Sequence, residues 1–277
     1  MSFHRVVVAL DTSGSLAALA TASGLARAME AELVGLFVED VDLLAFAALP
    51  FAGEVGFASA QWRALDVATM ERSLRAQARR IREALGKRLA GEPVKWTFEV
   101  VRGTTFTALA SVAAERDLAV VTVRRGADRA RADIARAIGT LPTALLIVPE
   151  STPPPRMIAV VAPAQAAPRE IAALVASLST HYGRAALFVT ADGEPARRAS
   201  WQRETAALLA EQGIAARFRA AGAATRAEVA RILAAEHPRL VVALAPSPAL
   251  RGAWVDALPY PVLVLPHPAP RTPSGVG

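Results

Sequence analysis

The fold is decided by the stretch Val6-Val7-Val8-Ala9-Leu10, which the sequence Asp11-Thr12-Ser13-Gly14 brings to an end. A short, continuously apolar run of this kind is typical of a strand that is buried on both faces, as in a parallel sheet. Thr12 or Ser13 can cap a following helix, which we expect to run to about Met29. The chain therefore begins as a strand and a helix of an α/β fold.

The same alternation continues through the first half of the chain. Further apolar runs predict strands over residues 33–38, 96–101, 118–123 and 144–148. Apolar residues at helical spacing predict helices over residues 66–90 and 105–115. Strands that alternate with helices imply right-handed crossovers and a five-stranded parallel sheet with helices on both faces.

One long segment interrupts the alternation. Residues 41–62 are apolar, and Pro50, Gly53 and Gly56 are expected to break any regular structure there. Long loops are usually functional or cover another part of the protein. We therefore expect an apolar loop that packs over the cleft of the first half or against a partner.

The second half repeats the first. Arg5–Leu10 aligns with Arg156–Val161 at an offset of 151 residues, and Leu141–Pro149 aligns with Leu258–Pro266 at an offset of 117. The second copy is shorter, and the apolar segment accounts for much of the missing length. A repeat of this size indicates duplication of a whole domain. The sequence thus predicts a first domain over residues 1–150 and a second over residues 156–266, with a linker over 151–155 and a disordered tail over 267–277.

The composition excludes several classes of function. The chain has 277 residues and no cysteine, and its four histidines are far apart in sequence, so a thiolate or histidine metal site is not expected. The net charge is +6, but arginine is spread along helices and aromatic residues make up 5% of the chain, which does not favour nucleic-acid binding. No signal peptide or membrane span is predicted, so we expect a cytoplasmic protein without membrane contact.

Ligands of an open parallel sheet bind beyond the carboxyl ends of its strands. Asp11 follows the first strand, where its carboxylate could hydrogen-bond a ribose hydroxyl or simply cap a turn. Gly139 and Thr140 supply a small residue and a hydroxyl for a phosphate, and the Leu141 N–H would come next. Arg124 and Arg125 could contact phosphates. The alternative is a glycine that ends a helix and two arginines on a solvated loop.

A family resemblance rests on several of these stretches. They are Val6–Ser13, Ala31–Val38, Val100–Gly103, Asp117–Val121, and Gly139-Thr140 followed by Ala144–Pro149. Over residues 5–149, and more weakly over 156–266, the chain resembles the universal stress protein family. The resemblance implies two tandem Rossmann-like domains of the adenine nucleotide alpha hydrolase-like kind, packed as a pseudo-dimer whose last strands pair antiparallel.

The resemblance also implies a site for ATP or another adenine nucleotide in the first domain. Asp11 would contact the ribose, Ala9 and Val38 would line the adenine pocket, and Gly139 and Thr140 would contact the phosphates. The full set of candidate binding residues is Ala9, Asp11, Val38, Val121, Thr122, Arg124, Arg125, Gly126, Gly139 and Thr140.

The sequence departs from the family's phosphate motif, G-x2-G-x9-G-[S/T]. Thr122 occupies the first glycine position and Arg125 the second, unless Gly126 takes it with a shift. These side chains would crowd a triphosphate. In the second half Ala162 stands at the position of Asp11 and Pro163 follows it, so we expect no site there.

No phosphate-binding loop, nucleophile elbow or zinc-protease motif is present, and no general base can be identified. We therefore expect a non-catalytic stress-response or regulatory module. Two alternatives stay open. One is a slow ATPase that uses Asp11 and Arg124, and the other is a ligand-free interaction scaffold that binds an unknown protein partner, or a second copy, through the apolar segment.

Overall fold

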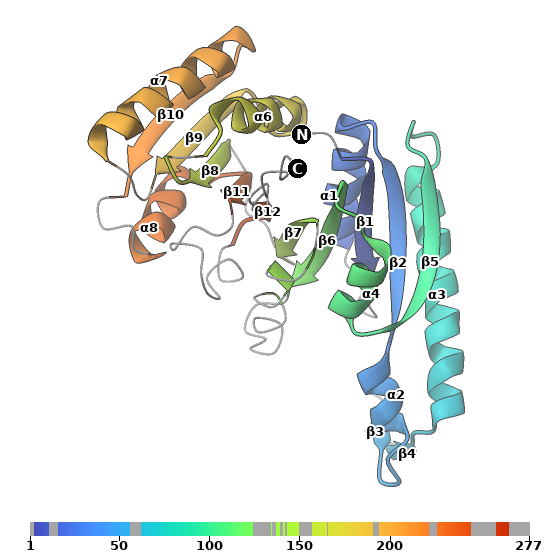
Figure 1. The fold of residues 1–277 in the computed structure, drawn as a ribbon. Coiled ribbons are helices and arrows are strands. Elements are labelled where there is room, and N and C mark those ends of the chain that lie inside the picture. Colours follow the sequence, from blue (N-terminus) through green and yellow to red (C-terminus); the bar gives the residue numbers. More distant parts are fainter. Residues whose placement is uncertain are drawn as a thin grey trace, which may run out of the picture. The chain divides into compact units, whose positions relative to one another are not determined.

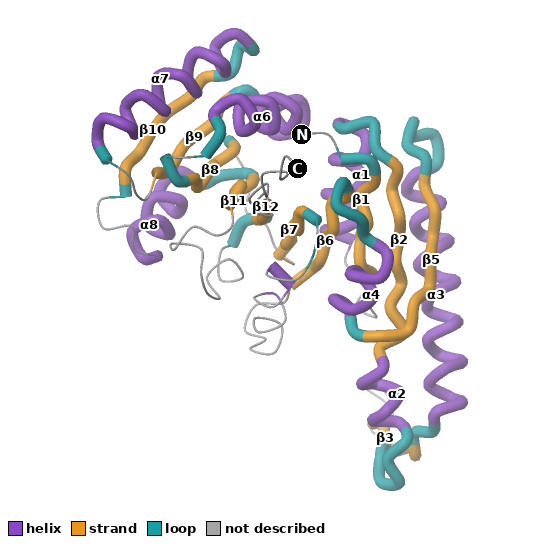
Figure 2. The backbone as a smooth tube through the Cα atoms, viewed as in Figure 1, coloured by secondary structure: helices purple, strands orange, loops and turns teal. Residues whose placement is uncertain are grey.

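Strands and helices alternate along the chain, as the sequence predicts (Figures 1 and 2). The structure is a computed structural model that describes residues 3–10, 16–55, 62–123, 134, 137–138, 141, 143–149, 157–164, 166–190, 194–221, 226–244 and 259–265. Backbone contacts divide the chain into two compact units. One comprises residues 3–122, and the other comprises residues 123–277 with residues 1 and 2.

The unit of residues 3–122 is built on a parallel sheet with strand order β6-β1-β2-β5. Its elements are β1 (Arg5–Leu10), α1 (Leu16–Ala28), β2 (Glu32–Asp40), α2 (Val41–Ala47), β3 (Gly53–Val55), β4 (Trp62–Ala64), α3 (Val67–Leu89), β5 (Trp96–Gly103), α4 (Thr105–Val112) and β6 (Asp117–Val123). Figure 1 shows α4 on one face of this sheet and α1 and α3 on the other. This follows from right-handed crossovers, because the chain first moves outward to β5 and then returns to β6.

Burial explains why the central strands are continuously apolar. Val6, Val7 and Val8 of β1 are fully buried, because helices cover both faces of the sheet. The long helix α3 begins at the predicted place, where the Asp66 side chain accepts a hydrogen bond from the Thr69 N–H at 2.8 Å. Its Leu85 packs over Gly35 of β2, where the missing side chain leaves room for the helix.

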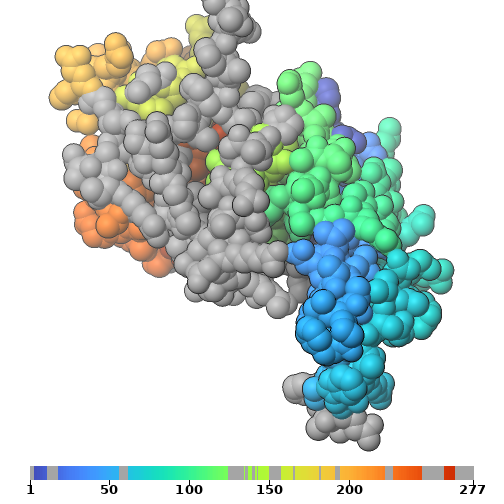
Figure 3. Space-filling view, turned by 60° about the horizontal axis from the view of Figure 1, so that its bottom comes forward, coloured from blue at the N-terminus to red at the C-terminus, as the bar shows by residue number. Residues whose placement is uncertain are grey.

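The prediction of an irregular loop over residues 41–62 is wrong. The segment contains α2 and one strand of the β3–β4 hairpin. The described residues 41–55 and 62–64 form the arm, which projects in Figure 3. Asp40 caps α2 by accepting from the Asp42 N–H at 2.8 Å. Gly53 does not break structure but lets the Trp62 ring lie across the hairpin, where a side chain at 53 would clash. These are packing effects, which glycine and proline counts do not reveal.

The unit of residues 123–277 has strand order β10-β9-β8-β11-β12-β7. Its elements are β7 (Ala144–Pro149), β8 (Ile158–Ala162), α6 (Pro168–Tyr182), β9 (Ala185–Thr190), α7 (Pro195–Glu211), β10 (Ala215–Ala220), α8 (Arg226–Glu236), β11 (Leu240–Leu244) and β12 (Val262–Leu265). The strands from β10 to β12 are all parallel, which confirms the predicted five-stranded parallel sheet for the second half.

The last strands of the two sequence repeats pair antiparallel, as expected. Leu146 of β7 lies opposite Leu263 of β12, and every residue of β7 is buried. This pairing places β7, which belongs to the first repeat in sequence, in the compact unit of the second. The compact units therefore do not coincide with the two sequence repeats, because β7 belongs to the first repeat but packs in the second unit. The domain limits at residues 150 and 156 stay predictions. The linker 151–155 and the tail 267–277 lie outside the described residues.

The second repeat lacks the arm. In the first repeat the arm separates β2 from α3, whereas β9 ends at Thr190 and α7 begins already at Pro195. The sheet face of this region is closed instead by a cluster of aromatic rings. Phe188 stacks on Phe218 with ring centroids 5.1 Å apart, and the Trp201 indole N–H donates to the Ala166 carbonyl at 2.8 Å.

Candidate functional site

The carboxyl ends of β6, β1 and β2 lie side by side, which brings four of the candidate binding residues to one edge of the sheet. Val8 pairs with Val120, so the next residues along these parallel strands, Ala9 and Val121, are neighbours. On the other side of β1, Leu10 pairs with Phe37. Val38 therefore lies one position further toward the same edge, and Thr122 follows Val121.

Three of these side chains form a small apolar surface. Ala9, Val38 and Val121 are 7%, 4% and 2% exposed, respectively. The methyl group of Ala9 leaves more room than the larger apolar residues that fill the rest of β1. These three side chains carry no group that could act as an acid or a base.

Thr122 is the polar residue among these four, through its hydroxyl oxygen. Its Oγ1 is buried and has no hydrogen-bond partner within the described part of the chain. An unpaired buried hydroxyl is unfavourable, by about 1–3 kcal/mol. The hydroxyl is therefore well suited to bind a polar atom that reaches the end of β6.

The remaining candidates lie outside the described residues. These are Asp11, Arg124, Arg125, Gly126, Gly139 and Thr140, and their roles stay predictions. One expectation next to them is wrong. The Leu141 N–H donates to the Ala137 carbonyl at 2.8 Å, so it continues a helical turn and is not free to bind a phosphate.

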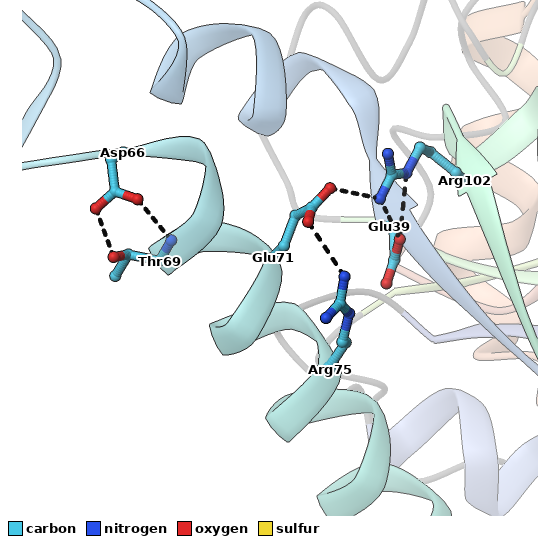
Figure 4. Close-up of polar contacts among 6 residues, drawn as sticks. All are labelled: Glu39, Asp66, Thr69, Glu71, Arg75 and Arg102. Carbon is cyan, nitrogen blue, oxygen red and sulfur yellow. Dashed lines mark hydrogen bonds and ion pairs between the residues drawn. The ribbon is translucent and has the colours of Figure 1, made fainter.

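A second polar cluster lies at the carboxyl ends of β2 and β5 and was missed by the sequence analysis (Figure 4). Arg102 pairs with Glu39 at 3.2 Å and with Glu71 of α3 at 2.9 Å, and Glu71 also pairs with Arg75 at 3.1 Å. The hydrogen bonds that Arg102 donates to Glu71 and Glu39 raise the pKa of Arg102. The cluster ties the first turns of α3 to the sheet.

The sequence held one signal for this cluster. Glu39 and Arg102 each stand at the end of a predicted strand, but only the register of β2 with β5 makes them neighbours. Glu71 is far from both in sequence, and its contact with Arg102 depends on how α3 crosses the sheet. The pattern of charges along any one segment therefore could not have revealed that Glu39, Glu71 and Arg102 form a cluster.

Metal and membrane functions find no support in the described ranges. They contain no group of three or more His, Cys, Asp or Glu side chains that could hold a metal ion. No helix within those ranges is both long and apolar enough to cross a membrane.

Comparisons with known proteins agree with this architecture. The sequence matches no family model and no curated protein. Among solved structures, a universal stress protein from Archaeoglobus fulgidus DSM 4304 is similar with a TM-score of 0.62 and 11% identity, over 95% of this chain and 97% of that one.

Two similar structures come from Pseudomonas aeruginosa. A protein from strain UCBPP-PA14, provisionally described as a universal stress protein, has a TM-score of 0.57 and 17% identity over 95% of this chain and 93% of its own. A functionally unknown protein from strain PAO1 has a TM-score of 0.56 and 17% identity over 95% and 92%. The chain thus has the α/β fold of universal stress proteins along nearly its whole length.

Proposed function

We propose that this chain is a universal stress protein of the tandem type, a non-catalytic cytoplasmic module that regulates a stress response by binding an adenine nucleotide in its first half. The observation that carries the proposal is the small apolar surface of Ala9, Val38 and Val121 at the carboxyl ends of three adjacent parallel strands. An adenine ring would lie against these three side chains, which share one face of the sheet.

The two halves differ in a way that favours one site in each chain. Asp11 follows β1 and supplies a carboxylate for the ribose, whereas the matching position in the second half is Ala162, which is 2% exposed. Pro163 follows it and has no N–H to donate. At this position the second half thus has no carboxylate to contact a ribose.

The absence of an identifiable base favours a binding role. A hydrolase needs a group that positions or deprotonates the attacking water. Thr122 is the polar candidate residue that the structure describes, and its hydroxyl is a poor base near neutral pH. Binding without rapid turnover is therefore the function that these residues support best.

The test is nucleotide content and affinity of the purified full-length chain. Small molecules are released by denaturation and identified, and ATP is then titrated by calorimetry into the emptied protein. We expect measurable ATP binding that Asp11→Ala weakens by about ten- to a hundredfold, since a hydrogen bond to a charged group contributes about 1.5–3 kcal/mol. Glu115→Ala, at an exposed position between α4 and β6 at the opposite end of the sheet, is the control and should bind like the parent.

Absence of both retained nucleotide and binding heat at millimolar ATP would refute the proposal. Release of ADP by the parent chain, lost in Asp11→Ala with the fold intact, would instead favour the slow ATPase. Circular dichroism spectra of each variant show whether the fold is retained.

A second candidate function is an interaction scaffold, which the arm favours. Six large apolar residues of the arm and the adjoining first turn of α3 are exposed. They are Phe46, Leu49, Phe51, Val55, Trp62 and Val67. Exposed apolar groups that gather on one projecting element are typical of a surface that binds another protein. The simplest partner is a second copy of this chain.

Sedimentation velocity tests this second function. The double variant Phe51→Ser and Trp62→Ser should convert a self-associating chain to a monomer and should leave its thermal unfolding nearly unchanged, because both rings are mostly exposed. Deletion of the whole segment is a poorer test, because Leu44 of the arm packs against Leu74 of α3 in the core. A parent chain that is monomeric at all concentrations would exclude the second copy.

A further inference from the structure

A groove of about 260 Å³ lies between α3 and β5, away from the candidate nucleotide site. Its floor is apolar and consists of Ala78, Phe98 and Val100. Arg75, Arg79 and Arg82 of α3 form one side. The groove therefore combines a small apolar floor with a row of cations on a helix.

The groove runs along an open sheet edge. Within the described residues, β5 pairs only with β2, so its other side has free backbone groups. The Leu33 N–H donates to the Lys95 carbonyl at 2.8 Å, which fixes the backbone of Lys95 toward β2. Because alternate residues of a strand point to opposite edges, the N–H and C=O groups of Phe98 and Val100 point outward.

The cations of the groove are only partly neutralised. Arg75 pairs with Glu71 at 3.1 Å, and Glu39, which also borders the groove, is held by Arg102 at 3.2 Å. Arg79 and Arg82 are exposed and make no ion pair within the described ranges. The groove thus has a surplus of positive charge beside an apolar floor and open backbone donors and acceptors.

We propose that the edge of β5 and this groove bind an extended segment of another protein in which acidic and apolar residues alternate along one face. The segment adds a strand to β5 through the outward backbone groups of Phe98 and Val100. An apolar side chain lies on the floor, and carboxylates two residues away on the same face pair with Arg79 and Arg82. This inference does not depend on nucleotide binding by the opposite part of the sheet.

Charge disfavours a second copy of this chain as the occupant. Two-fold pairing of β5 with β5 would bring the α3 arginines of both chains to the same side of the joined sheet. Like charges held close together repel. The groove has three arginines and one glutamate, so its carboxylate cannot offset this repulsion. An acidic partner gains attraction from the same arrangement.

Fluorescence anisotropy on the full chain tests the proposal. The probe is a labelled twelve-residue peptide of repeated Glu-Thr-Val-Thr, which places Glu and Val alternately on one face and Thr on the other. We expect saturable binding that the double variant Arg79→Glu and Arg82→Glu weakens at least tenfold. Arg80→Glu, a single charge reversal at an exposed position of α3 outside the groove, should weaken binding less than threefold, and Arg79→Glu alone should weaken it more than Arg80→Glu does.

A backbone test separates strand addition from charge attraction alone. N-methylation of alternate residues removes peptide N–H groups in one of two registers and leaves the protein unchanged. One methylated register should abolish binding and the other should retain it. Val100→Pro, which removes an outward N–H of β5, should also abolish binding, with circular dichroism as the check on folding.

Three outcomes would overturn the proposal. The first is equal binding of the Glu peptide and a Lys-Thr-Val-Thr peptide. The second is equal loss in the groove variant and in Arg80→Glu, which would indicate general charge attraction. The third is a chain dimer that Val100→Pro converts to a monomer, which would make a second copy the occupant.

Discussion

Arg5 and Asp117 join the first strand of the sheet to β6 by an ion pair of 2.6 Å at the amino ends of both strands. Asp117 is almost fully buried, and it also accepts a hydrogen bond from the Ala114 N–H at 2.8 Å. Arg5 donates a further hydrogen bond to the Val112 carbonyl at 2.9 Å. The hydrogen bond with Asp117 raises the pKa of Arg5. This pair fixes the end of the sheet opposite to the candidate site.

Asp117→Asn should lower the free energy of unfolding by about 2 kcal/mol, because the buried partner of Arg5 loses its charge while the shape is kept. Urea unfolding followed by circular dichroism measures the change. Glu92→Gln is the matched control, since its pair with Arg27 at 3.1 Å is exposed on both sides and should contribute less than about 1 kcal/mol. Equal changes in the free energy of unfolding for the two substitutions would contradict a larger contribution from the buried Arg5–Asp117 pair.

The carboxylate of Asp66, which caps the N-terminus of α3, should titrate at a lower pH than an ordinary aspartate. Thr69 donates to Asp66 from both its hydroxyl and its N–H, and these bonds lower the pKa of Asp66. A carboxylate with a lowered pKa stabilises the folded state above the unfolded pKa of about 3.8, and this contribution is lost as pH falls through the folded value. NMR titration of the carboxyl carbon should show a rise of the pKa in Thr69→Val and no change in Ser73→Ala.

Gly35→Ala should destabilise the sheet. A Cβ at this position would lie 2.8 Å from Leu85 Cδ2 and 3.1 Å from Phe98 Cδ2, and overpacking of a core typically costs about 1–3 kcal/mol. The second change Leu85→Val should recover part of the loss. Gly86→Ala in α3 is the contrasting variant, because its Cβ meets Trp96 at 3.4 Å and should raise stability through helix propensity, by up to about 1 kcal/mol. Thermal unfolding of the three variants and the parent chain distinguishes these expectations.

Thr205→Val should stabilise the chain by about 1 kcal/mol. The Thr205 hydroxyl is buried without a hydrogen-bond partner in the described ranges, and valine keeps the shape and removes the unpaired group. Thr190→Val is the comparison, because the Thr190 hydroxyl donates to the Arg219 carbonyl at 3.4 Å. Denaturant midpoints that fall in Thr205→Val would show that this hydroxyl is satisfied in solution.

Much of the fold could be predicted from the sequence because its signals are local. The apolar run of β1, the helical spacing of α3 and the repeat of Leu141–Pro149 by Leu258–Pro266 all lie within short segments. Burial on both faces of a parallel sheet leaves a continuous apolar run, and a duplicated domain leaves a duplicated pattern. The antiparallel pairing of β7 with β12 was implied by the resemblance to universal stress proteins, not by the repeat.

The arm shows where local signals fail. Pro50 and Gly53 are common in loops, but Leu44 is buried against Leu74, and the side chain of Trp62 occupies the space that Gly53 leaves. These contacts decide that the segment contains a helix and a hairpin. Neither contact is visible in the order of residues.

The sequence by itself determined the α/β alternation and the tandem repeat, because each depends on neighbours along the chain. Only the tertiary structure decided that Glu39, Glu71 and Arg102 form one cluster, and that Arg79 and Arg82 stand beside the open edge of β5. The physical reason is that strand register and helix crossing are set by packing of the whole core, which brings together charges that lie far apart in sequence.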